Sequence, residues 1–143
     1  MMTERNSEPP RIVVTSQDLE RLRTVIDTNG HSRSIEASDS LEAELARAVV
    51  VEPVQISPDV VTMNSRVVYL DEQSQQTREV TLCYPRDASV AEGRVSVLAP
   101  IGAALLGLSV GQVIEWPLPR GQHKRLRIMA VPYQPEAAGH FHL

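Results

Sequence analysis

The apolar positions of the first fifty residues follow helical spacing. Between residues 19 and 26, apolar side chains recur three or four positions apart, which predicts an amphipathic helix. Thr15 is the expected N-cap, because Asp18 follows three positions later as in a loose capping box. Gly30 is the expected stop of this helix. The apolar run "RIVV" at 11–14 comes before the helix. It indicates a short strand or a segment that packs against another part of the fold.

A second helical pattern predicts a helix from about Glu36 to Val50. Its expected apolar face consists of Leu41, Leu45, Ala48 and Val49. Two such helices with a short link make a helical hairpin, and at about 1.5 Å per residue each arm is only about 20 Å long. Pro53 and Pro58 end the helical part, so residues 53–59 are predicted to be an extended linker.

After the linker the apolar residues alternate with polar ones, which is typical of strands. The segments "SRVVYLDE" and "REVTLCYP" flank the polar turn "EQSQQ" and predict a β-hairpin. "GRVSVL" predicts a third strand, and "QVIEWPL" and "KRLRIMAV", joined through "PRGQH", predict a fourth and a fifth. The whole chain is therefore predicted to have an α+β fold, with the helical hairpin followed by an antiparallel sheet.

The stretch "LAPIGAALLGLSVGQVIEWPLP" at 98–119 interrupts the alternation and contains one charged residue, Glu115. Pro100 suits the first position of a helix, and Gly107 suits the residue just after its end. The residues between them leave no polar face, so this short helix must be buried. We expect the sheet to wrap around it, with Leu105 facing the core and residues 98–100 closer to the surface.

Composition narrows the class of protein. The chain has 143 residues, of which 42% are hydrophobic and 3% aromatic, so its core must be mostly aliphatic. No run approaches the roughly 20 apolar residues that span a bilayer, and the polar start is unlike a secretory signal. Cys83 is the only cysteine; it is expected to be inert core, and a reducing cytoplasm is the simplest location. No membrane partner is expected.

The net charge of −4 lies entirely in the N-terminal part. Residues 1–56 hold six basic and ten acidic residues, whereas residues 57–143 hold eight of each. Proteins that bind nucleic acid through charge need a basic excess, which neither part has. Sequence-specific binding of nucleic acid is therefore not expected, and a protein or small ligand is the favoured partner.

Several segments together resemble a known family. "EGRVSVLAPIGAALLGLSVGQVIEWPLPRG" is similar to the C-terminal domain of the Gre transcript-cleavage factors, and the match continues upstream through "MNSRVVYLDE". The short helical hairpin, "DVVTMNSRV" and the ending "YQPEAAG" resemble more closely the Rnk type, the regulators of nucleoside diphosphate kinase. The resemblance covers about residues 11–139.

This resemblance implies an FKBP-like C-terminal domain, an N-terminal coiled-coil hairpin and docking of a monomer near the secondary channel of bacterial RNA polymerase. The expected organisation is a disordered segment at 1–10, a hairpin at 11–52, a linker at 53–59, the C-terminal domain at 60–139 and a tail at 140–143. The expected function is regulation of transcription by competition with longer Gre-type factors.

The family also indicates two candidate sites. One is a turn that reads S-P in Gre factors and is implicated in contact with the polymerase there; in this chain Ala99 replaces the serine. The resemblance therefore implies that the polymerase is contacted by Leu98, Ala99, Pro100, Ile101 and Gly102. The expected hairpin tip consists of Asp27, Asn29, His31, Arg33 and Glu36. Gre factors carry two acidic residues at this tip that help to hold a catalytic metal ion. No such pair is present here, so no catalytic residue, cofactor, metal site or cleavage activity is expected.

Other interpretations remain open at this stage. Prolyl isomerisation would need an aromatic-lined pocket, for which the chain offers only Tyr69, Tyr84, Trp116, Tyr133 and Phe141. His140 and His142 are better explained as part of a frayed tail than as a metal site. The basic cluster of Arg120, His123, Lys124, Arg125 and Arg127 could meet an acidic protein or RNA, or could form a solvated hairpin. An adaptor that binds a non-polymerase partner through its sheet is the alternative function.

Overall fold

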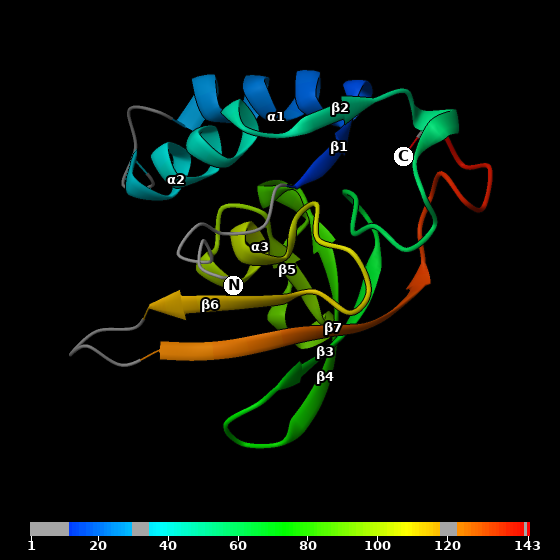
Figure 1. The fold of residues 1–143 in the computed structure, drawn as a ribbon. Helices are drawn as coiled ribbons and strands as arrows, with labels where there is room; N and C mark the ends of the chain where they lie inside the picture. The colour runs from blue at the N-terminus through cyan, green and yellow to red at the C-terminus, as the bar shows by residue number, and fades with distance from the viewer. Residues whose placement is uncertain (1–11, 30–34, 118–122, 142) are drawn as a thin grey trace, which may run out of the picture.

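A pair of helices and a two-stranded sheet form the N-terminal part of the fold, which lies over the main sheet (Figure 1). The computed structural model describes residues 12–29, 35–117, 123–141 and 143. Helices α1 (Ser16–Asn29) and α2 (Ile35–Ala46) pack against each other, as the sequence predicted. Strands β1 (Val13–Thr15) and β2 (Val49–Val51) pair in parallel beside them.

Helix α1 starts where its capping residues predicted. The Thr15 hydroxyl accepts a hydrogen bond from the Asp18 main-chain N–H at 3.0 Å, which satisfies one of the free donors of the first turn. Leu22 is fully buried, and the other apolar residues of the predicted face pack partly buried against the core. This buried face, rather than helix propensity, supplies most of the stability of such a short helix.

The second helix is shorter than the pattern predicted. It ends at Ala46 rather than Val50, and Val49 and Val50 belong to β2 and are exposed. The Val49 N–H donates to the Ile12 carbonyl at 2.8 Å, so pairing with β1 competes with a further helical turn. A run of three β-branched valines favours the strand. Leu41 and Leu45 of the predicted apolar face are buried as expected.

The C-terminal part contains a five-stranded sheet in the order β5-β4-β3-β7-β6. Its strands are β3 (Arg66–Asp71), β4 (Gln76–Cys83), β5 (Arg94–Ser96), β6 (Val113–Pro117) and β7 (His123–Tyr133). All neighbours are antiparallel except β4 and β5, which run parallel. Short 3₁₀ turns, η1 (Pro53–Gln55), η2 (Pro85–Asp87) and η3 (Val90–Glu92), connect the elements. The five predicted strands are confirmed, but the expected antiparallel arrangement is wrong for β5, which pairs in parallel with β4.

Helix α3 (Pro100–Leu105) lies between the helical layer and the sheet, and it contacts α2, β4 and β5 (Figure 1). Leu105 and Leu106 are buried, which confirms that this apolar stretch contributes side chains to the core. Gly107 follows with φ +80°, a left-handed conformation that glycine adopts readily. A side chain there would also collide with Ile12, whose Cβ would lie 2.4 Å away.

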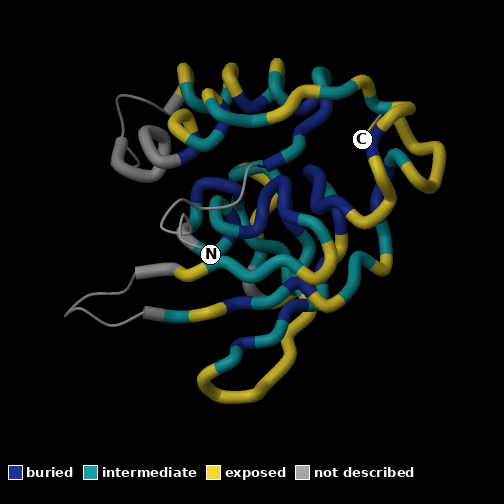
Figure 2. Tube along the Cα trace, in the orientation of Figure 1, coloured by how far each residue is buried: buried dark blue, intermediate teal, exposed yellow. Residues whose placement is uncertain are grey.

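One apolar core joins the two parts of the chain. Ile12, Leu22 and Leu41 from the N-terminal part belong to the same buried cluster as Val61 and Leu105 from the C-terminal part. Figure 2 shows these buried segments between the helical layer and the sheet, with the largely exposed β3–β4 turn at the far end. Because the core is shared, α1 is held against a defined face of the C-terminal domain.

Candidate functional site

The turn that enters α3 is held in place by hydrogen bonds to the side chain and the main chain of Ser96. The Leu98 N–H donates to the Ser96 hydroxyl at 3.0 Å, and the Ala99 N–H donates to the Ser96 carbonyl at 3.0 Å. A Cβ built on Gly102 would lie 2.0 Å from that same carbonyl oxygen. Glycine is therefore required at this position, and the turn and the first residues of α3 form one rigid unit.

The exposure of this turn differs in part from the expectation. Leu98 is buried in the core, so its predicted place near the surface is wrong; the side chain completes the packing around α3. Ala99 and Ile101 are half-buried, and Gly102 is buried. Pro100 is the first residue of α3, as predicted, and its side chain lies outside the described residues. Of the four candidate contact residues whose burial the structure describes, Ala99 and Ile101 are partly accessible.

The predicted hairpin tip lies mostly outside the part of the chain that the structure describes. Asp27 is exposed on the last turn of α1, which ends at Asn29. Glu36 lies in the first turn of α2. His31 and Arg33 belong to the undescribed segment between the helices, as do the side chains of Asn29 and Glu36. The role of these residues therefore stays a prediction.

A buried polar cluster, which the sequence patterns did not reveal, joins α1 to the C-terminal domain. We call it the junction cluster; it consists of Thr15, Asp18, Thr62, Ser65 and Glu136. Asp18 is only 2% exposed, and its Oδ2 accepts a hydrogen bond from the Met63 N–H at 3.2 Å. The Thr62 hydroxyl contacts both the Ser65 hydroxyl and the Glu136 carboxylate at 2.8 Å.

Burial governs the protonation of Asp18. Desolvation is the largest of the causes that raise its pKa to about 7, and the charge of Glu136 acts in the same direction. The Met63 N–H, the Arg21 charge and the Thr15 hydroxyl act in the opposite direction without overcoming burial. The sequence identifies Asp18 only as a capping residue, because Met63 and Glu136 are 45 or more positions away along the chain.

The C-terminal segment completes the junction. The Gln134 amide donates to the carbonyls of Ser57 and Val60 at 2.7 and 2.8 Å. The Tyr133 hydroxyl and His140 Nδ1 lie 2.7 Å apart, so the exposed His140 has a contact within the chain. His142 lies outside the described residues. Within the described residues, no group of three or more His, Cys, Asp or Glu side chains is arranged to hold a metal ion.

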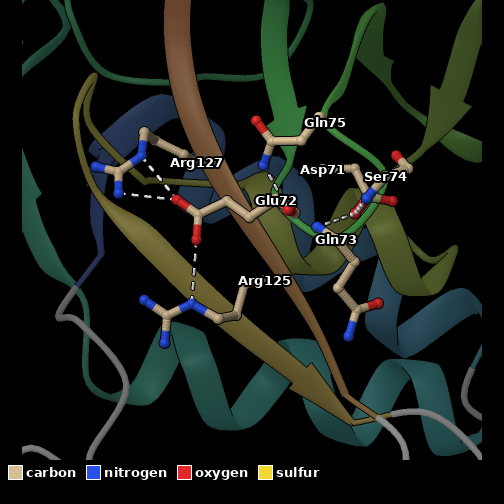
Figure 3. A network of polar contacts seen from close by, with 7 residues as sticks. All are labelled: Asp71, Glu72, Gln73, Ser74, Gln75, Arg125 and Arg127. Carbon is tan, nitrogen blue, oxygen red and sulfur yellow. Dashed lines mark hydrogen bonds and ion pairs between the residues drawn. The ribbon is translucent and has the colours of Figure 1, made fainter.

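The basic cluster of β7 lies beside acidic residues at the end of β3. Figure 3 shows Glu72 with Arg125 and Arg127. Glu72 accepts from Arg125 at 3.2 Å and from Arg127 at 2.8 Å, and these contacts lower its pKa. Lys124 pairs with Asp71 at 3.1 Å and lowers the pKa of that carboxyl. Arg120 and the His123 side chain lie outside the described residues. Three of the five predicted basic residues therefore already have acidic partners within the chain.

The described aromatic side chains do not line a common pocket. Tyr69 is in the core, Tyr133 contacts His140, Phe141 is exposed, and Tyr84 faces α1 in a pocket described below. The Trp116 side chain lies outside the described residues. Cys83 is buried as predicted, and burial raises the pKa of its thiol. No described helix is long and apolar enough to cross a membrane.

Comparison with known proteins agrees with this division of the chain. Residues 56–133 match the family model for the C-terminal part of the GreA/GreB transcription elongation factors, and residues 10–51 match the model for the Rnk N-terminus. The chain is 40% identical over 132 residues to the "Regulator of nucleoside diphosphate kinase" of Escherichia coli K12, covering 92% of this chain and 96% of the relative.

The chain is also similar to a GreA factor and to a solved GreA/GreB structure, over different shares of its length. Over 74 residues it is 35% identical to transcription elongation factor GreA of Thermodesulfovibrio yellowstonii, covering 52% of this chain and 47% of that factor. A solved structure of a GreA/GreB elongation factor from Nitrosomonas europaea is 46% identical, with a TM-score of 0.67, and covers 87% of this chain and 99% of its own. These relatives carry the names of regulators and elongation factors rather than of enzymes. The chain therefore belongs to the GreA/GreB elongation factor family, and within it to the Rnk-type regulators of nucleoside diphosphate kinase.

Proposed function

We propose that this protein regulates transcription by docking on RNA polymerase near the secondary channel, where it competes with longer Gre-type factors without promoting transcript cleavage. The observation that supports this proposal is the combination of a Gre-type C-terminal domain at 56–133 with a short helical pair. Helix α1 has 14 residues and α2 has 12. At about 1.5 Å per residue, the longer arm spans only about 21 Å. In this proposal the helical pair acts as a coiled coil at the channel entrance.

The docking surface in this proposal is the partly accessible side of the turn at 98–102, where Ala99 and Ile101 are half-buried, and α3 and the Ser96 carbonyl hold this turn in place. A preorganised surface loses little conformational entropy on binding. The protein acts as a cytoplasmic monomer, and the FKBP-like domain provides docking and not isomerase chemistry. Regulation of nucleoside diphosphate kinase, which the names of the relatives indicate, is then an effect on transcription.

Competition provides the direct test. A backtracked elongation complex is treated with a Gre factor at a concentration that gives half-maximal cleavage, and this protein is then titrated in. We expect cleavage to fall with increasing protein and to recover when more Gre factor is added. Independent binding of both factors would refute a common site. Failure to bind polymerase at all would favour the adaptor function instead.

A further inference from the structure

A pocket of about 800 Å³ lies between α1 and η2, next to the junction cluster. One wall is the face of α1 that carries Arg21, Thr24 and Thr28. Tyr84 and Arg86 belong to the opposite wall, which the C-terminal domain supplies. A ligand bound here would touch both parts of the chain.

The charges of the pocket favour an anion. Arg21 and Arg86 bring two guanidinium groups, and Asp87 is the only acidic residue among the lining side chains. Guanidinium groups recognise carboxylates with charge-assisted hydrogen bonds, which are stronger than neutral ones. The Tyr84 hydroxyl is buried beside Arg21 and has no hydrogen-bond partner of normal geometry among the described residues. Arg21 and Tyr84 therefore offer donors on this side of the pocket. The acidic Asp18 and Glu136, whose charges act on Tyr84, are not among the residues that line it.

The chain itself shows which chemistry the pocket accepts. Leu143 lines the pocket, and its main-chain oxygen accepts a hydrogen bond from Arg21 Nη1 at 2.7 Å. Val25 and Pro85 supply apolar surface in the same pocket. Leu143 thus brings an apolar side chain and a main-chain oxygen to the edge of the pocket. Leu143 remains 38% exposed.

We propose that this pocket is a docking site for a peptide segment of a partner protein in which a leucine-like side chain lies beside a carboxylate, and that Leu143 occupies it until the partner displaces it. The pocket spans α1 and the C-terminal domain, so the incoming segment also contacts both parts. The proposal concerns a different surface from the α3 turn, and it does not depend on polymerase docking.

The test uses the full ¹⁵N-labelled chain and N-acetyl-L-leucine as the probe. We expect saturable amide shifts around Arg21, Thr28 and Tyr84. N-acetyl-L-leucinamide, which keeps the apolar group but lacks the charge, should bind about tenfold more weakly, because hydrogen bonds to charged groups contribute more than neutral ones. Equal binding of the acid and the amide would overturn the carboxylate assignment. Equally tight binding of inorganic phosphate would point to a general oxyanion site and overturn the peptide assignment.

Two substitutions should change the affinity in opposite directions. Arg21→Gln removes the guanidinium and should weaken N-acetyl-L-leucine binding about tenfold or more, whereas Leu143→Ala weakens the internal competitor and should tighten it. Arg23→Gln is the matched control, because Arg23 is exposed on the same helix and does not line the pocket. Thermal unfolding of each variant checks the fold. Absence of binding to Leu143→Ala, or binding to Arg21→Gln as tight as to Arg23→Gln, would refute the proposal.

Discussion

Asp18 is a single residue that serves two structural purposes. Its main-chain N–H takes part in capping α1, while its carboxylate leaves the helix and accepts a hydrogen bond from Met63 in the C-terminal domain. A buried carboxylate is stable only when hydrogen-bonded or protonated. The position of α1 on the domain is therefore linked to the protonation of one side chain.

The raised pKa of Asp18 predicts a pH-dependent stability. The folded state holds this proton up to about pH 7, whereas an unfolded Asp releases it near 3.8. The free energy of unfolding should therefore fall as pH rises from about 4 to 7 and then level off. One pKa unit corresponds to about 1.4 kcal/mol, so the decrease is limited to about 4 kcal/mol. The pKa values of Asp71 and Glu72 are lowered instead, so their contribution to the pH dependence of the free energy of unfolding has the opposite sign.

Asp18→Asn should reduce this dependence, because the amide is uncharged at every pH. Urea unfolding at pH 5.5 and pH 8 measures the difference for the parent chain and the variant. Asp27→Asn is the control, since Asp27 is an exposed aspartate on the same helix. An unchanged pH dependence in Asp18→Asn would show that another group is responsible.

Ala99 leaves the N-terminus of α3 without a side-chain cap. Its φ of −70° and ψ of 150° are those of an N-cap residue. Ala99→Ser should therefore add a hydrogen bond to the first turn and stabilise the protein by about 0.5–2 kcal/mol. Ala103→Ser, inside the helix, should bring no such gain. Thermal unfolding compares the two variants, and equal effects would contradict a specific cap.

Substitutions in the turn and in α3 can distinguish a residue that packs in the core from a residue that contacts a partner. Leu105→Ala should leave a cavity in the core and cost about 2–5 kcal/mol. Pro100→Ala changes the first helical position, where no hydrogen bond is lost, and should cost about 1 kcal/mol or less. Leu98→Asp is unsuitable as a surface variant because Leu98 is buried.

If the turn docks, Pro100→Ala should weaken binding to RNA polymerase while the melting temperature changes little. Leu105→Ala should lower the melting temperature and lose binding only as the fold is lost. Paired thermal unfolding and polymerase titrations measure both quantities for each variant. Loss of binding in Pro100→Ala only in proportion to lost stability would refute the docking role of this turn.

At the scale of the molecule, the length and sequence of the helical pair bear on whether a docked protein could stimulate transcript cleavage. Helix α1 spans about 21 Å, and the chain between the helices lacks the paired carboxylates that recruit a hard cation. We therefore expect no stimulated cleavage when this protein and Mg²⁺ are added to a backtracked complex. Shortened RNA is measured on a gel, with a Gre factor as the positive control. Cleavage at the level of that control would contradict the proposed function.

The sequence by itself determined the local elements, because their signals involve residues close together in the chain. Thr15 and the apolar spacing located α1, alternation located the five strands, and Pro100 with Gly107 bounded α3. The S-P-like turn was found by family resemblance, and the apolar character of the α3 stretch correctly predicted the burial of Leu105 and Leu106.

Only the tertiary structure decided the features that depend on distant partners. The parallel pairing of β1 with β2 turned Val49 and Val50 from an expected helix into a strand, since a main-chain partner at Ile12 was available. The burial of Asp18, the pairing of Arg125 and Arg127 with Glu72, and the pocket beside Arg21 each join segments tens of residues apart. Periodicity carries no information about such contacts, because they arise when separate elements pack into one shared core.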